Sequence, residues 1–378
     1  MNFLASLIYL WIAGMFLCLL IVKWAKHPCP LRELLPLSFL IGTGAGVYFL
    51  FIFYVSGIRF SLSAILVLLS FFYAGSAYLL VFAGKKSVLI CPDSAAREKF
   101  HTAEKFLLSG ILLQTLWVLL VTFPIPVSSH DAVANYALKA KMFFTNSGIP
   151  AGFFAFQEYQ VAHPDYPLFL PLVMTWIYEF TGFNDLTVKM LMPVIYMVFL
   201  CLFYALSRKF FSRMYALLAV FMLSTIPQFA DYAAIIHADF ILTVFTASAV
   251  IYMALYIRDT QKIHLIFSSL LFGFSLLVKN EAIVFSGAFI MVMIALMLKK
   301  KEKRIKDGLG DLFIALSVMA IASAPWFIVK FFESKTNSDI NLAIITPAAI
   351  WGNIKDIPLL LDLFQQEVFG PKKWIYSG

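Results

Sequence analysis

Ten long apolar runs occupy most of this 378-residue chain, and they constrain its fold more than any other feature. A helix needs roughly 20 apolar residues to cross the hydrocarbon core of a bilayer. The runs lie at 3–23, 35–54, 62–83, 106–125, 187–206, 214–229, 237–257, 263–278, 282–298 and 311–331. Hydrophobic residues make up 62% of the chain and charged residues 13%, against about 45–50% and about 25% in a soluble domain. The sequence therefore predicts an all-α, polytopic integral membrane protein with about ten transmembrane helices.

The basic residues indicate how these helices are oriented. The formal net charge is +8, and most of the lysines and arginines fall in short segments between apolar runs, at 23–32, 84–105, 208–213, 258–262 and 299–306. This pattern is typical of cytoplasmic loops and argues against a nucleic-acid site. All five segments lie on the cytoplasmic side of the membrane only if the apolar stretch 167–180 does not cross it. We therefore expect 167–180 to form a juxtamembrane or re-entrant helix on the outer side.

Three segments follow from this topology. Residues 1–104 form an additional N-terminal membrane segment of three spans and a cytoplasmic loop, and its first span is expected to be retained because no signal-peptide cleavage site precedes Lys23. Residues 105–331 form a catalytic membrane core. Residues 332–378 form an extracytoplasmic segment, and we expect that any spans beyond it were truncated or never present. The predicted location is the plasma (inner) membrane.

The longest outer loop carries a predicted helix over 131–145. Val133, Tyr136, Ala140 and Phe143 recur at helical spacing, which gives the helix an apolar face and places Asp131, Asn135 and Lys139 elsewhere. Such a helix lies in the membrane interface. This arrangement holds Asp131 over the outer membrane surface.

Two carboxylates on this side are the candidate catalytic groups. Asp131 begins the loop helix, and Asp239 lies at the outer end of the run 237–257, with Asp231 and His237 before it. Transfer of a group to a hydroxyl or an amine requires a base, because the nucleophile loses a proton as it attacks. Asp131, Asp239 and His237 could also hold a divalent metal. The alternative for both aspartates is a purely structural role in the first turn of a helix.

Two further groups of residues are candidate substrate-binding groups. Prolines flank His163, Asp165 and Tyr166, and residues before proline avoid the α region, so we expect a rigid extended segment. Lys279 and Glu281 occupy the turn between the runs 263–278 and 282–298, where a lysine could meet a lipid phosphate. Lys139 is a second candidate cation. Structural turns with solvated charges are the alternative in both places.

Taken together, these blocks resemble the GT-C membrane glycosyltransferases. The likeness is to the bacterial branch of glycosyltransferase family 39 and its protein-mannosyltransferase and aminoarabinose-transferase relatives. It is carried by the helix starting at His130-Asp131-Ala132, the block 163–168, Asp239 at the start of a span, and Lys279-Asn280-Glu281 in a later turn. It covers about residues 105–330. Many members carry a second acid directly after the first, and Ala132 occupies that position here.

The resemblance implies a polyprenyl-phosphate sugar donor and transfer on the outer face with inversion. It makes Asp131 the catalytic carboxylate and Asp239 the second acidic position, which supports the acceptor or a metal. No cofactor is implied with certainty, and a divalent metal is one option. The expected partners are the lipid-linked donor and membrane lipids.

Two other functions remain open at this stage. A flippase or transporter of lipid-linked sugars places charges and broken helices near the bilayer midplane, whereas the acids here gather at the outer surface. A polysaccharide polymerase or ligase also works on the outer face, and a strongly basic outer loop would favour it. The outer loop before the run 187–206 contains two basic residues, Lys139 and Lys141, and is therefore not strongly basic.

Overall fold

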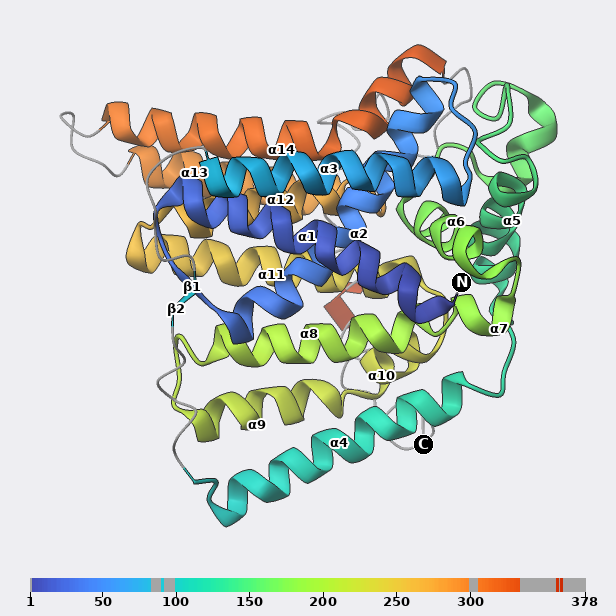
Figure 1. Cartoon of the computed structure of the whole chain (residues 1–378). Coiled ribbons are helices and arrows are strands. Elements are labelled where there is room, and N and C mark those ends of the chain that lie inside the picture. Colours follow the sequence, from blue (N-terminus) through green and yellow to red (C-terminus); the bar gives the residue numbers. More distant parts are fainter. Residues whose placement is uncertain are drawn as a thin grey trace.

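The computed structural model describes residues 2–82, 90–91, 99–298, 305–333, 358–359 and 361–362. Within these residues the chain is almost entirely helical (Figure 1). The strands described are the two-residue segments β1 (Cys29–Pro30) and β2 (Ile90–Cys91), which pair in parallel. The predicted all-α fold is confirmed.

Within the described residues, seven helices are long and apolar enough to cross a membrane, or eight if the bent pair 213–234 counts as one span. They correspond to seven of the ten apolar runs, and the fifth of them consists of α7 (Asp185–Val188) and α8 (Leu191–Ser207) in succession. The others are α1 (Phe3–Ala25), α2 (Leu31–Val55), α3 (Leu62–Phe82), α4 (Thr102–Thr122), α11 (Ala238–Asp259) and α14 (Ile305–Glu333). The chain is therefore a multi-pass membrane protein.

The remaining three runs form shorter helices. The run 214–229 becomes α9 (Arg213–Ser224) and α10 (Pro227–Ala234), which meet at an angle of 67°. The bend has a local cause, because Pro227 starts α10 without a backbone N–H and so cannot continue the ladder of α9. The apolar run 214–229 is thus the first part of a bent pair of helices. The other two are α12 (Lys262–Ser275) and α13 (Ala282–Leu298).

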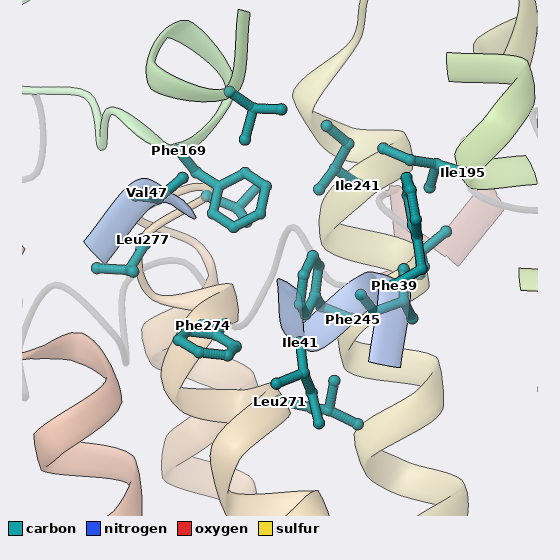
Figure 2. Close-up of a cluster of buried hydrophobic side chains, with 14 of the residues drawn as sticks. Phe39, Ile41, Val47, Phe169, Ile195, Ile241, Phe245, Leu271, Phe274 and Leu277 are labelled. Atoms are coloured by element: carbon teal, nitrogen blue, oxygen red, sulfur yellow. The ribbon is translucent and has the colours of Figure 1, made fainter. Parts of the chain in front are cut away.

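Helix α2 lies at the centre of the molecule. Its side chains Phe39, Ile41 and Val47 meet Phe245 of α11 and Phe274 of α12 in a closely packed apolar cluster (Figure 2). The helix also packs against α1, α8 and α14. The first helices of the chain therefore belong to the same core as the later ones.

The contact between α1 and α2 depends on two glycines. A Cβ atom on Gly42 would lie 1.9 Å from the carbonyl oxygen of Leu10, and one on Gly14 would lie 1.8 Å from that of Ser38. Membrane helices pack this closely only where small residues let the backbones approach.

One end of the helical bundle gathers the basic segments that were predicted to be cytoplasmic. Lys209 pairs with Glu33 at 2.7 Å, Arg213 pairs with Glu104 at 2.7 Å, and Arg258 donates to the carbonyl oxygen of Lys209. β1 and β2 lie at this end, on the left of Figure 1. Residues 84–89 and 92–98 of the basic segment 84–105, and residues 299–304 of the segment 299–306, are outside the described part of the chain.

The opposite end carries the outer-loop segments and α6 (Phe169–Thr181), which corresponds to the predicted juxtamembrane helix. Its 13 residues span about 20 Å at 1.5 Å per residue, which is less than the roughly 30 Å of a hydrocarbon core. The indole N–H of Trp176 donates to the carbonyl oxygen of Ser6 at 3.1 Å, and the N–H of Phe169 donates to that of Leu277 at 2.9 Å. α6 is thus fixed between α1 and the end of α12. Within the predicted extracytoplasmic segment 332–378, the sequence 357–369 has an amphipathic pattern, and most of it lies outside the described residues.

Candidate functional site

The outer-loop helix begins as a π-helix, η2 (Ala132–Ala137), and continues as α5 (Leu138–Thr145). Tyr136, Ala140 and Phe143 are buried, as the sequence pattern predicts. Val133 is 50% exposed, however, while Lys139 is fully buried and Asn135 is 8% exposed, so the predicted apolar face is wrong at these three positions. The reason is the i→i+5 hydrogen bonding of a π-helix, which shifts the register away from a 3.6-residue period.

A pocket of about 120 Å³ opens beside this helix. Asp131 and Tyr136 line it from the helix, His163 and Tyr166 from the following loop, and Lys279 from the turn between α12 and α13. The other lining residues are His130, Ala134 and Asn135. Residues separated by almost 150 positions in the sequence thus meet in one hollow at one end of the bundle.

Asp239 joins the pocket through an ion pair. It lies in the first turn of α11, and its Oδ1 is 2.6 Å from the Lys279 Nζ; Glu281 Oε1 lies 3.3 Å from the same nitrogen. Burial disfavours the charge on Lys279, but the hydrogen bond to Asp239 and the two negative charges outweigh burial and raise the pKa of Lys279. Lys279 is therefore a protonated cation shared between two carboxylates.

His237 supports Asp239 from the N-cap of α11. Its Nδ1 accepts the backbone N–H of Asp239 at 3.3 Å and lies 3.2 Å from the Asp239 carboxylate. Its ring stacks on Tyr232 with centroids 4.3 Å apart. Burial lowers the pKa of His237, and the charges of Asp239 and Asp131 only partly offset this effect. The imidazole is thus neutral near pH 7 and acts as a helix cap.

The block 163–167 forms a tight turn and not the extended segment that its prolines predict. His163 has a φ of 47°, in the left-handed region, and its carbonyl oxygen accepts the N–H of Tyr166 at 3.1 Å. A non-glycine residue pays an energetic cost for this conformation and keeps it only where neighbouring contacts enforce it. The His163 side chain remains exposed and edge-on to the Tyr166 ring, with centroids 5.6 Å apart.

Side chains from three elements hold this turn by its backbone. Lys139 donates to the carbonyl oxygen of His163 at 2.9 Å. Lys330 of α14 and Asn280 donate to that of Asp165, at 3.3 Å and 3.5 Å. The side chains of Lys139 and Asp165 are buried and do not line the pocket. Both were predicted to bind substrate, whereas in the structure Lys139 supports the turn of which Asp165 is part.

Burial lowers the pKa of Lys139 from 10.5 to about 7, with Asp165 opposing and Lys330 adding to the shift. Between these two values the unfolded chain holds a proton that the folded chain releases, so Lys139 makes the stability rise with pH across this window. We expect Lys139→Met to flatten that rise in melting temperature between about pH 7 and 10. Thermal unfolding in detergent at several pH values measures it. Lys141→Met, at an exposed position of α5, should keep the wild-type slope, and an unaltered slope in Lys139→Met would contradict the assignment.

The candidate metal ligands do not fit a metal site. Among the residues that the structure describes, no group of three or more His, Cys, Asp or Glu side chains is arranged to hold an ion. Oδ1 of Asp239 already faces the Lys279 ammonium, and Asp131 is 67% exposed with His130 Nδ1 at 3.7 Å. We therefore derive no step through a metal.

Two buried residues of this helix line the pocket and were not predicted as site residues. Tyr136 is 5% exposed; burial raises the pKa of its hydroxyl, and the charges of Asp239 and Asp131 raise it further. Tyr136 is thus a neutral hydroxyl with both candidate carboxylates around it. Asn135 is 8% exposed, and its Oδ1 has no hydrogen-bond partner in the described structure. Neither carried a sequence signal, because both belong to an ordinary helical pattern.

Comparison with known proteins supports one family. Searches of curated proteins and of solved structures gave no match. The matching family is described as dolichyl-phosphate-mannose-protein mannosyltransferase, and the match covers residues 165–328. Asp165, Asp239, Lys279 and Glu281 lie within it, whereas Asp131 precedes it. Over residues 165–328 the chain thus matches a family of GT-C glycosyltransferases, which confirms the resemblance seen in the sequence and indicates a membrane glycosyltransferase.

Proposed function

We propose that the protein transfers a sugar from a polyprenyl-phosphate donor to a lipid, glycan or protein acceptor on the outer face of the plasma (inner) membrane. The observation that carries this proposal is the pocket that unites Asp131, His163, Tyr166 and Lys279, with Asp239 bound to Lys279. An exposed carboxylate beside a hollow at a helix-bundle end has the access that a general base for an incoming acceptor needs.

In the proposed reaction Asp131 takes the proton of the acceptor hydroxyl. The acceptor oxygen attacks the anomeric carbon, the bond from that carbon to the phosphate oxygen breaks, and the electron pair leaves with the lipid phosphate. Asp131 is more exposed than Asp239, with 67% against 40% of the side chain accessible. Asp239 is held by Lys279 and His237, so its role is to position Lys279 and the pocket wall. Tyr166 offers an aromatic face to the sugar.

The described structure gives the transporter alternative less support. That function places charged residues near the bilayer midplane. The charged side chains described above lie instead at the two ends of the bundle, as the Glu33–Lys209 and Asp239–Lys279 pairs illustrate. The bend between α9 and α10 is a broken helix of the transporter kind, but it adds no charge at the break beyond Asp231 of α10.

The direct test incubates the purified protein with a panel of radiolabelled polyprenyl-phosphate sugars and measures both sugar transfer and the release of the lipid phosphate. We expect release with at least one donor. Movement of a donor across proteoliposomes without any transfer would identify a transporter and reject the proposal.

The sidedness is tested by labelling introduced cysteines. Glu158→Cys, in the exposed 3-10 helix Gln157–Ala162, should react with an impermeant maleimide from outside intact cells. Lys262→Cys, at the exposed start of α12 on the basic end, should react only after the cells are opened. Both variants are made in a background without the four native cysteines. The reverse labelling pattern would place the pocket on the cytoplasmic face and refute an outer active site.

A further inference from the structure

A second hollow, of about 70 Å³, adjoins the start of the helix η2. It is lined by Val121 at the end of α4, by Ser128 and Ser129 of the loop, by Ala132 of η2 and by Lys189 between α7 and α8. The remaining walls are Ile125, Pro126, Val127, Ala234, Ile235 and Ile236. Apart from the two serines and one lysine, the side chains around this hollow are apolar.

Lys189 is the exceptional residue here. It is 3% exposed, and its Nζ is shielded from solvent without a hydrogen-bond partner among the residues that the structure describes. A buried ammonium without a partner loses its hydration and gains nothing in return. Such a group is expected where a ligand supplies the missing negative charge.

The other buried or partly buried lysines described at this end are already engaged. Lys279 is bound by two carboxylates, Asp239 and Glu281. Lys139 donates to the His163 carbonyl oxygen, and Lys330 donates to that of Asp165. The two cations that the sequence nominated for an anionic ligand, Lys279 and Lys139, therefore serve the protein itself. Of these four lysines, Lys189 is the one whose Nζ has no hydrogen-bond partner among the described residues.

We propose that Lys189 binds the phosphate group of an isoprenoid-phosphate ligand in this hollow. This inference rests on the proposed function, since it assigns the donor's phosphate to a place beside the active pocket. Ala132 lines the Lys189 hollow and Asp131, its neighbour in the chain, lines the pocket with His163 and Tyr166. A phosphate at Lys189 would hold the adjoining sugar next to the turn that carries Asp131.

The position also provides an apolar route for the isoprenoid chain. Val121 and Ile125 lead from the hollow to α4, whose side chains Leu116 and Leu120 are 50% and 62% exposed. Figure 1 shows α4 at the edge of the molecule, beside α9 and α10. An isoprenoid that lay along this face would keep its tail in the lipid while its phosphate reached Lys189.

The charge of Lys189 suits the leaving group. The donor is a phosphodiester with one negative charge, and the departing carrier is a phosphate monoester that gains the electron pair of the broken bond. A fixed cation next to the phosphate stabilises this growing charge. The serine hydroxyls of Ser128 and Ser129 could donate hydrogen bonds to the same oxygens.

The test measures binding by thermal stabilisation and by isothermal titration in detergent, without any sugar transfer. The probes are farnesyl phosphate, inorganic phosphate and farnesol, each added to the wild type and to Lys189→Met. We expect farnesyl phosphate to bind the wild type about 10- to 100-fold more tightly than the variant, the loss typical of a charged hydrogen bond. Farnesol should not distinguish the two proteins.

Several outcomes separate the possibilities. Stabilisation by inorganic phosphate as well would show that the hollow takes the free ion, whereas an effect of farnesyl phosphate alone would show that the chain is required; both support the site. Equal affinity of wild type and Lys189→Met for farnesyl phosphate, or no binding at all, would overturn it. Because binding is measured directly, a protein that binds the probe yet transfers no sugar would reject the proposed function and keep the phosphate site.

Two controls keep the result interpretable. Met has nearly the length of Lys and removes an unpaired buried amine, so the ligand-free Lys189→Met protein should melt at or above the wild-type temperature. Lys141→Met, at an exposed lysine of α5 over the Phe183 ring, should bind farnesyl phosphate as the wild type does. Equal weakening in Lys141→Met would show that general surface charge, and not Lys189, attracts the ligand.

Discussion

Replacing Asp131 with Asn is expected to lower the rate of sugar transfer by about 10²- to 10⁴-fold, the usual contribution of a general base. The amide has nearly the shape of the carboxylate but cannot accept the acceptor's proton. Since the Asp131 side chain is 67% exposed, the variant should fold and melt like the wild type. Transfer of labelled sugar by purified protein, together with thermal unfolding, measures both effects.

The matched control for Asp131 is Glu158→Gln. Glu158 is an exposed carboxylate of the same outer loop, and it does not line the pocket. It should retain wild-type transfer. Full activity in Asp131→Asn would remove this residue from the mechanism and leave Asp239 and Glu281, the two carboxylates on Lys279, as the acids of the site.

Replacing Gly42 with Leu is expected to give the largest loss of stability. Any Cβ at this position would lie 1.9 Å from the carbonyl oxygen of Leu10, so α1 and α2 would have to separate. Overpacking typically costs about 1–3 kcal/mol and occasionally more, and here the obstacle is backbone that cannot rotate away. The variant should melt at a lower temperature and lose its monodisperse peak in size-exclusion chromatography.

Gly75 of α3 offers the comparison for Gly42. No atom lies within 4 Å of a Cβ at that position, so Gly75→Leu should leave the melting temperature close to that of the wild type. An unchanged melting temperature for Gly42→Leu would show that the α1–α2 crossing does not have the packing described.

The overall architecture could be predicted from the sequence because the bilayer imposes simple rules on length and charge. Helices form at all ten apolar runs, and the position of α6 follows from the same charge pattern. The bend at Pro227 illustrates the limit of this reasoning. Hydropathy reports how apolar a run is, but it does not report the direction of the helix, and so the 67° angle between α9 and α10 is known only from the structure.

Individual site residues were less predictable. Asp131, His163, Tyr166 and Lys279 carry polar or proline signals in otherwise apolar surroundings, and they meet in one pocket. Their functional roles stay predictions. Lys139 is buried and Val133 is exposed, the reverse of the predicted pattern, because η2 is a π-helix. A single sequence does not distinguish the period of a π-helix from that of an α-helix.

The sequence by itself determined that this chain is a helical membrane protein with its acidic candidates at one end, because apolar length and basic clusters act locally along the chain. Only the tertiary structure decided which lysines already have a partner within the protein. Lys279 binds two carboxylates, Lys139 supports a strained turn, and Lys189 lies buried without a partner among the described residues. These differences arise because the partners of each lysine come from segments far apart in the sequence. The sequence shows that each residue is a lysine, but it does not show which side chains lie next to it.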